Sequence, residues 1–429
     1  MNNQNFAESS TTLKYLEKRI DKIDNWVDRN LSCFQPLVAD CPKGTDYRRK
    51  AFGEAGLYIY VAAQYEAFGS PTALVESYWH TISSNEYLDL ARRNLATYGL
   101  YAFPVAVAKS LGKSTEKLDA YFEDTYLSTH LRSIELPPFR LMDNLFFAKI
   151  YGLSEMPYSL KEVNRLTNMN RLPDPIQCDE AQAYALTHNI FYLTGMKVNQ
   201  DFLGLEPTYG HLQLQALEAL FVRYMANNNL DLALELLMCL ILTGLCKRWH
   251  LQYALDLVDK NLIGHTIVPG PGEPEGFEKL SETSDEFQTW VKHYHTMLVA
   301  GMTFRLAATH IDTIWARGPS LSYFAAYASG QLVRLLNDYN LPLALTVLKT
   351  LEEQIPDIQR LDIEYILTFS LRFIEQQCQA DGKVGFYYDQ YHALTTTGKT
   401  WDEAVNTIQV PLLNIHRQIN WQQFDALAS

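Results

Sequence analysis

The sequence predicts an all-α protein built from repeated pairs of helices. Apolar residues recur at helical spacing along nearly the whole chain. No run of alternating β-branched residues bounded by hairpin turns occurs in the sequence. Similar apolar segments begin at residues 187, 236 and 294. A period of about fifty residues is the length of two helices with their turns, so each repeat is expected to be one helix pair.

The helices are predicted in order from their apolar stripes. The first carries Tyr15, Ile20, Ile23, Trp26 and Val27 on one face, between Lys and Asp residues. The remaining stripes predict helices over 45–67, 86–111, 114–130, 139–152, 179–194, 208–227, 230–246, 250–262, 284–308, 319–337, 341–353, 360–379 and 401–418. The total is about fourteen helices, which fits a helical repeat protein.

Local start signals support four of these boundaries. Residues 179–182, 283–286 and 400–403 each have a capping residue followed three positions later by Gln or Glu, as in a capping box. Asn340 precedes Leu341-Pro342, and proline is tolerated in the first turn of a helix.

Repeated helix pairs form either an open solenoid or a closed ring. Two features favour a closed α/α toroid, similar to a six-hairpin barrel. The candidate inner helices carry polar residues on otherwise apolar faces, and a glycine-rich turn at 381–386 follows a long helix. We therefore expect one toroidal domain over residues 1–429, with residues 1–44 forming an N-terminal helix and connection.

The charge balance excludes some classes of partner. The chain has 36 Lys and Arg against 49 Asp and Glu, which gives a formal net charge of −13. Nucleic-acid binding requires a basic surface, and anionic membranes attract basic segments, so neither is expected as a partner. The oligomeric state is not predicted.

A cytoplasmic location is expected from the sequence. Residues 1–22 lack the basic and apolar regions of a signal peptide. The longest apolar stretch, 230–246, contains Asp231 and Glu235, which argues for a buried helix instead of a membrane span. Six cysteines are scattered without a CxxC pair, which argues against a zinc ribbon.

The strongest candidate site is centred on His188. Glu180, Tyr184, Thr187, His188 and Phe191 share one face of the helix that begins near residue 179. A carboxylate, a phenol, a hydroxyl and an imidazole on one stripe predict a catalytic group. In the alternative interpretation, Glu180 is a solvated first-turn acid and His188 is a hydrogen-bonded core residue.

His295 is the second candidate. It shares a helix face with apolar residues such as Val291 and Leu298, as many core histidines do. In a toroid, equivalent positions on inner helices would bring His295 and His188 together. Two imidazoles suit a transition metal ion such as zinc, iron or copper, so both are candidate metal ligands. The alternative without a metal is a general base that works near neutral pH.

His265 completes the candidate catalytic residues. It precedes the proline- and glycine-rich segment 269–276, which cannot be helical. This segment could cover the mouth of a cavity and bring His265 with it, or it could be a surface connection between repeats.

Other chemistries have weaker support. Asp381 and Asp389 flank a turn beside Tyr387, Tyr388 and Tyr391, so a glycan-active toroid with paired carboxylates is a further alternative. The sequence contains no GxSxG, HExxH, Walker A or GxGxxG motif. No nucleotide cofactor is therefore indicated.

Three motifs resemble a known family. They are Leu186-Thr-His-Asn-Ile-Phe-Tyr-Leu-Thr194, Gly264-His265 followed by Pro269-Gly-Pro-Gly272, and Tyr294-His-Thr-Met-Leu-Val299. In this order they resemble a family of bacterial helical proteins known only as a domain of unknown function. The resemblance implies one domain with one site built from several helices, and it implies no activity.

The resemblance to better-known toroid enzymes is distant. The turn at 381–386 is similar to repeats of squalene-type cyclases, but the chain lacks their DxDD-type acid motif. It also lacks the Cys-His pair of lanthionine cyclases.

These observations predict an enzyme that tailors a small molecule or peptide in bacterial secondary metabolism. His188 and His295 are expected at its centre. The competing prediction is a non-catalytic scaffold that binds a peptide or a partner protein, for which the net charge would favour a basic ligand.

Overall fold

The computed structural model describes residues 3–38, 44–94, 97–128, 133–153, 158–171, 173–198, 207–274, 276–317 and 321–376. These segments contain 17 α-helices, short 3-10 turns and no β-strand; a single isolated bridge joins Ile263 and Ile267. The prediction of an all-α protein is confirmed. None of the described helices combines the length and the apolar character needed to cross a membrane.

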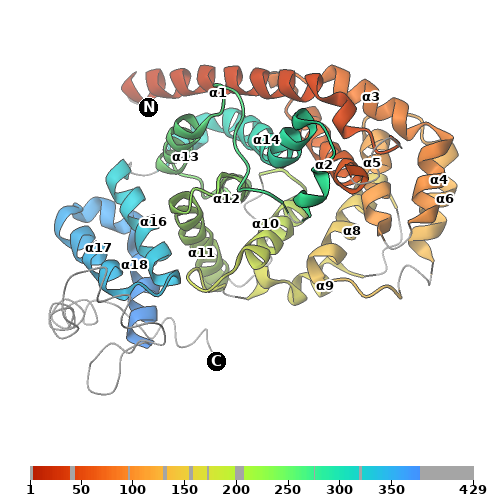
Figure 1. Ribbon diagram of the computed structural model, residues 1–429. Helices are drawn as coiled ribbons and strands as arrows, with labels where there is room; N and C mark the ends of the chain where they lie inside the picture. Colours follow the sequence, from red (N-terminus) through yellow and green to blue (C-terminus); the bar gives the residue numbers. More distant parts are fainter. Residues whose placement is uncertain are drawn as a thin grey trace.

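The helix bounds follow in chain order, with the labels of Figure 1. They are α1 (Asn3–Arg29), α2 (Thr45–Gln64), α3 (Thr72–Ile82), α4 (Asn85–Arg93), α5 (Tyr98–Ser110), α6 (Glu116–Leu127), α8 (Pro138–Tyr151), α9 (Leu160–Leu166), α10 (Glu180–Thr194), α11 (Pro207–Ala226), α12 (Leu230–Leu242), α13 (Arg248–Asn261), α14 (Asp285–Thr309), α15 (Ile311–Trp315), α16 (Tyr323–Asn337), α17 (Leu341–Gln354) and α18 (Asp357–Gln376).

Six helices pack in cyclic order, and we call them the six-helix ring. Helices α2, α5, α8, α10, α12 and α14 each contact the next, and α14 contacts α2 again. They begin at residues 45, 98, 138, 180, 230 and 285, with other helices between them in the chain. Among these others, α1 packs on α14, α9 on α8, and both α11 and α13 on α12. This arrangement is consistent with the predicted repeats of helix pairs.

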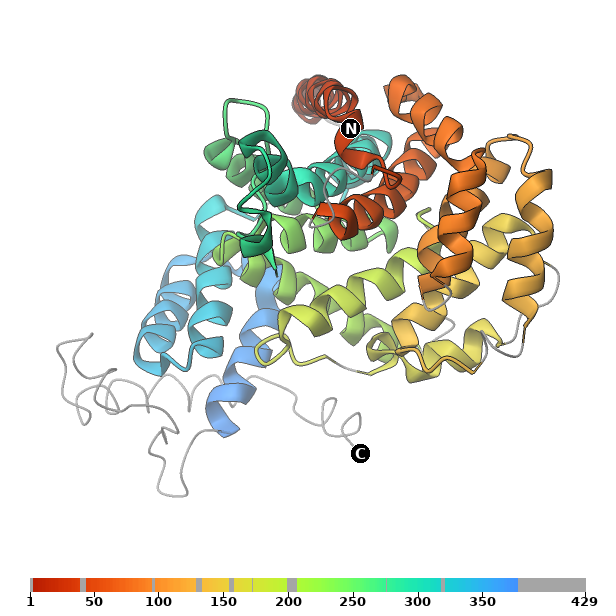
Figure 2. The same ribbon diagram turned by 45° about the vertical axis from the view of Figure 1, so that its right-hand side comes forward.

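The outer elements are visible in two views. Helix α1 runs along one side of the molecule, whereas α16, α17 and α18 group at the end remote from α4 and α6 (Figures 1 and 2). Helix α16 packs against α11, and α18 packs against both α11 and α16. The C-terminal helices are therefore an addition on the α11 side of the six-helix ring.

Several predicted boundaries need correction. The single helix expected over 86–111 is two helices, α4 and α5, because Asn94 has non-helical φ and ψ angles and its side chain donates to the Leu90 carbonyl. Helices α3, α9 and α15 have no counterpart among the predicted helices. Ser284, not Thr283, caps α14, since its hydroxyl accepts from the Phe287 amide, whereas the Thr283 hydroxyl donates to Leu280 O.

The other start signals divide into two groups. Asp179 and Gln182 form the predicted capping box, and Asn340 caps α17 by accepting from the Leu343 amide. The predicted helix over 401–418, its capping box at 400–403 and the glycine-rich turn at 381–386 lie outside the described residues.

A largely buried polar cluster joins α14, the last ring helix in the chain, to α2, the first, and to α1. Its three residues are Asp24, Tyr58 and Arg305, and we call them the ring clamp. The fully buried Arg305 of α14 donates to Asp24 Oδ2 of α1 (2.5 Å) and to the Tyr58 hydroxyl of α2 (2.9 Å). Tyr58 in turn donates to Asp24. One turn earlier on α14, a Cβ atom at Gly301 would lie 2.5 Å from the Tyr58 ring, so the close approach of these helices requires glycine there.

A second, largely buried group attaches α18 to the helices near the six-helix ring. Lys247, just before α13, pairs with Glu218 of α11 (3.3 Å) and with Asp362 of α18 (3.0 Å). His250 of α13 is fully buried, and its Nε2 atom lies 2.8 Å from Glu218 Oε1. The group therefore joins α11, α13 and α18.

This group makes the fold sensitive to acid. Burial would raise the pKa of Glu218, but the contact with His250 and the charge of Lys247 lower it overall. Burial lowers the pKa of His250. Both groups therefore bind protons more readily in the unfolded chain. Their contribution to stability is complete at neutral pH, and it declines as the pH falls below about 6.5 for His250 and below about 4.5 for Glu218.

The acid sensitivity can be measured as a pH series of thermal melts. We expect the melting temperature to fall as the pH decreases from 7 toward 4 and below. In Glu218→Gln the decrease below about pH 4.5 should be less steep, because the glutamine side chain binds no proton in that range. Equal slopes of the two proteins below pH 4.5 would contradict the role of Glu218.

Candidate functional site

A cavity of about 910 Å³ lies among the six ring helices. Every one of these helices contributes to its wall. Representative lining residues are Glu54 (α2), Phe103 (α5), Arg140 (α8), His188 (α10), Glu235 (α12) and His295 (α14). Side chains far apart in the sequence therefore face one common space.

Helix α12 supplies two buried acids to this cavity. All thirteen residues of α12 are buried, and all are apolar except Asp231 and Glu235. The two acids are one turn apart and so share a helix face. They are 2% and 1% exposed. Because a buried carboxylate is costly without partners, the groups around these two acids define the site.

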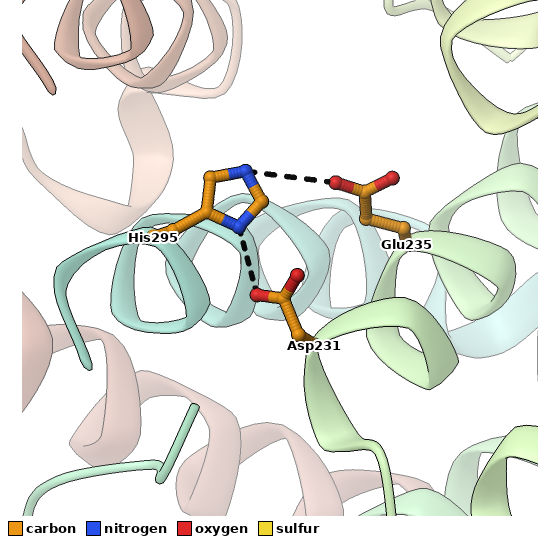
Figure 3. A group of neighbouring side chains, drawn as sticks. All are labelled: Asp231, Glu235 and His295. Carbon is orange, nitrogen blue, oxygen red and sulfur yellow. Dashed lines mark hydrogen bonds and ion pairs between the residues drawn. The ribbon is translucent and has the colours of Figure 1, made fainter. Parts of the chain in front are cut away.

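Asp231 is held by three side chains. Its Oδ1 atom lies 2.8 Å from His295 Nδ1 and accepts from the Thr296 hydroxyl (2.6 Å), while its Oδ2 atom accepts from the Tyr184 hydroxyl (2.6 Å). Burial would raise the pKa of Asp231, but the charge of His295 and these hydrogen bonds lower it to about 2. Asp231 is therefore a carboxylate that fixes the orientation of the His295 ring (Figure 3).

The other nitrogen of His295 faces two further acids. Its Nε2 atom lies 3.7 Å from Glu54 Oε1 and 3.8 Å from Glu235 Oε1, both beyond hydrogen-bond distance. Burial would lower the pKa of His295, but the charges of Asp231, Glu54 and Glu235 raise it to about 10. The side chain is 27% exposed, so the cavity reaches the imidazole.

Glu235 and Glu54 have different partners. Glu235 Oε2 accepts from the Thr187 hydroxyl at 2.5 Å, and burial, together with the charges of Asp231 and Glu54, raises its pKa to about 8. Glu54 pairs with Lys50 at 3.6 Å. The site thus gathers three carboxylates around one imidazole and one ammonium group. It can transfer protons at His295 or hold a cation there.

The Thr187 contact can be tested by its effect on stability. In Thr187→Val, Glu235 Oε2 loses its donor inside the protein, so we expect the free energy of unfolding to fall by about 1–3 kcal/mol. Thr187→Ser keeps the hydroxyl and is the matched control. Urea unfolding would measure both, and equal stability of the Val and Ser variants would contradict the role of the hydrogen bond.

Helix α10 carries the residues that were predicted around His188. Tyr184 binds Asp231, so it belongs to the His295 cluster. His188 lies on the cavity wall among the rings of Phe139, Phe191 and Tyr192. Its Nδ1 atom has no hydrogen-bond partner in the described part of the chain, and burial lowers its pKa to about 3.

The expected pairing of His188 with His295 is replaced by a different set of contacts. Within the described segments, no hydrogen bond or ion pair joins the two rings. Among the residues that the structure describes, Asp231, Glu235 and His295 form the group whose ligand atoms all lie within 4.8 Å of one another. Both histidines line the same cavity, but acids take the place next to His295 that was expected for His188.

The two remaining candidates lie at the edge of the cavity or outside it. Glu180 is an exposed cavity-lining residue that accepts from the Asn229 side chain (3.1 Å). His265 is exposed and does not line the cavity; its carbonyl oxygen accepts from Arg19 and Lys22 of α1. We therefore leave His265 out of the site. The loop that follows His265 does reach the cavity, through residues 271–274.

Sequence reasoning missed the three acids. From the sequence, Asp231 and Glu235 argue only against a membrane span. Two acids one turn apart in an otherwise apolar helix were the signal that could have identified them. Glu54 had no comparable signal. Asp381 and Asp389, the candidate glycan-cleaving pair, lie outside the described residues.

Fold and site together define an all-helical protein with a histidine–carboxylate cluster inside a ring of helices. The chain belongs to the family described as a domain of unknown function (DUF6895), which matches residues 21–304. The predicted membership of such a family is confirmed. The matched residues include α2 through α13 and most of α14, and thus nearly all of the six-helix ring. No curated protein and no solved structure matches the chain.

Proposed function

We propose that the protein is an enzyme that acts on a small molecule or a peptide held in the cavity, with His295 at the reacting centre. The observation that carries the proposal is the placement of His295, between Asp231 on one side and Glu54 and Glu235 on the other, at the wall of a cavity of about 910 Å³. Pockets for small ligands have volumes of about 300–1,000 Å³.

The surroundings of His295 favour a reacting group over a structural one. Asp231 holds Nδ1, so the ring presents Nε2 to the other acids and to the cavity. A carboxylate that fixes one imidazole nitrogen while the other faces a substrate is a recurrent catalytic arrangement. A histidine with only a structural role would not need three carboxylates beside an open cavity.

His188 and the rings around it would bind the apolar part of the substrate. Phe139, Phe191 and Tyr192 surround the imidazole, with ring centroids 6.0–6.1 Å from it. Its low pKa keeps the ring neutral, so it can donate or accept one hydrogen bond without a charge.

The proposal extends to architecture and setting. We propose that the six-helix ring, with the helices outside it, is a closed α/α toroid in a single domain. A tailoring role in bacterial secondary metabolism and a cytoplasmic location are also proposed, and both are supported by sequence alone.

Comparison of metabolites tests the proposed function. The purified protein is incubated with a small-molecule extract of bacterial cells, and compounds are compared by mass spectrometry before and after. We expect at least one compound to be converted by the wild type and by His310→Ala, whose histidine lies at the end of α14 and does not line the cavity. We expect no conversion by His295→Ala. If no conversion depends on His295 and a pull-down recovers one stoichiometric partner, the proposed enzyme is wrong. The protein is then a non-catalytic scaffold that binds this partner.

A further inference from the structure

We propose that His295 Nε2, Glu54 and Glu235 bind a divalent first-row metal ion, with Asp231 as the outer carboxylate that orients the imidazole. The site is the one used by the proposed function, and this inference assigns it a ligand. It also changes the predicted ligand set, because His188 is replaced by two glutamates.

The distances from His295 Nε2 to the two glutamates suit binding to one ion. Nitrogen and oxygen ligands lie about 2.0–2.2 Å from zinc, so two ligands of a tetrahedral ion are about 3.4 Å apart. The distances from His295 Nε2 are 3.7 Å to Glu54 Oε1 and 3.8 Å to Glu235 Oε1. Glu235 and His295 already lie in one compact group, and the Glu54 side chain, which is 27% exposed, would rotate toward them to complete the ligand set.

Incompletely paired carboxylates provide independent support. The Glu235 side chain is only 2% exposed, and Thr187 binds its Oε2 atom, while its Oε1 atom faces His295 Nε2 from beyond hydrogen-bond distance (Figure 3). Glu54 Oε2 is also buried and accepts no hydrogen bond of good geometry within the described segments, although the Tyr294 side chain is a neighbour of this carboxylate. Burying a carboxylate oxygen without a donor is costly. A bound cation would supply the missing partner.

The outer contacts also match those of a metal site. Histidine ligands commonly donate their second N–H to a carboxylate, which fixes the ring orientation. Asp231 is the carboxylate that contacts His295 Nδ1. The Thr187 hydroxyl fixes the second ligand in the same way, by donating to Glu235 Oε2. The orientations of His295 and Glu235 are therefore set before any ion arrives.

The charges favour a divalent ion. Binding of the ion requires a neutral His295 and deprotonated glutamates, and in that state three carboxylates face the ammonium group of Lys50. The remaining two negative charges equal the charge of one divalent cation. One imidazole with two carboxylates suits zinc, manganese or iron, and three protein ligands leave a position open toward the cavity.

Metal titration of matched variants tests the proposal. The protein is stripped with a chelator, and Zn²⁺, Mn²⁺ and anaerobic Fe²⁺ are titrated by calorimetry, with elemental analysis after dialysis. We expect one ion per wild-type chain, and affinity at least about 100-fold weaker in His295→Ala and Glu235→Gln. His188→Gln is expected to bind as the wild type does. Glu54→Gln, at a partly exposed side chain, is a further test if a buried variant fails to fold.

Three results would overturn the metal site. One is the absence of stoichiometric binding of all three ions by the wild type. Another is undiminished binding by His295→Ala or Glu235→Gln. The third is loss of binding in His188→Gln, which would point to the two-histidine site. If the metal-free protein converts a metabolite and the conversion depends on His295, the proposed enzyme is supported and only the metal site is wrong.

Discussion

Replacing Arg305 by Met is expected to lower the free energy of unfolding by about 3–5 kcal/mol. Arg305 is fully buried and pairs with Asp24, whose side chain is only 15% exposed. Methionine fills much of the volume but removes the opposite charge beside Asp24, which keeps only the hydrogen bond from the Tyr58 hydroxyl. The Tyr58 hydroxyl loses a donor as well. Urea unfolding followed by circular dichroism would measure the loss.

A double variant separates the lost charge pair from lost packing. In Asp24→Asn/Arg305→Met, no buried charge remains in the ring clamp, so much of the stability should return. Tyr58→Phe removes only hydrogen bonds and should cost about 1 kcal/mol. A double variant as unstable as Arg305→Met would show that packing, not charge, dominates the ring clamp.

Replacing Asp231 by Asn is expected to reduce turnover by roughly 10²–10⁴-fold. In the proposed enzyme Asp231 is a positioning residue, because it accepts from Thr296 and Tyr184 and holds His295. An amide at this position offers one acceptor oxygen where two now serve, and its NH₂ group faces a donor. Either His295 and Thr296 or the Tyr184 hydroxyl would then lose its acceptor, and the His295 ring would lose the negative charge beside Nδ1.

The kinetic parameters distinguish positioning from a general loss of structure. We expect the decrease in kcat with little change in KM, measured on the compound identified in the metabolite comparison. Thr296→Ser keeps the donor to Asp231 and should retain most of the turnover. A folded Asp231→Asn protein with wild-type kcat would remove Asp231 from the mechanism.

Helix class and order could be predicted because apolar periodicity is a local property. The repeats at 187, 236 and 294 identified three helices, α10, α12 and α14, that are neighbours in the six-helix ring. The break between α4 and α5 was missed because it depends on the backbone angles of Asn94. A polar residue such as asparagine is also common on a helix surface, so the sequence pattern does not reveal the break.

The candidate site was predictable only in part. Tyr184, His188 and His295 stood out because each places a polar group on a helix face, and all three line the cavity. The contact between Asp231 and His295 joins residues 64 positions apart, and no helical period relates them. Their pairing depends on how α12 packs against α14, which the sequence pattern does not specify.

The ring clamp also has a consequence for synthesis on the ribosome. Asp24 and Arg305 are separated by 281 positions in the chain. At a synthesis rate of about 5–20 residues per second, Asp24 is made roughly 15–60 seconds before its partner. During that interval the nascent N-terminal helices cannot bury the faces that later meet α14. The N-terminal helices are therefore exposed longest to chaperones that bind apolar segments. This exposure ends when the last turns of α14 have been synthesised and can pack against them.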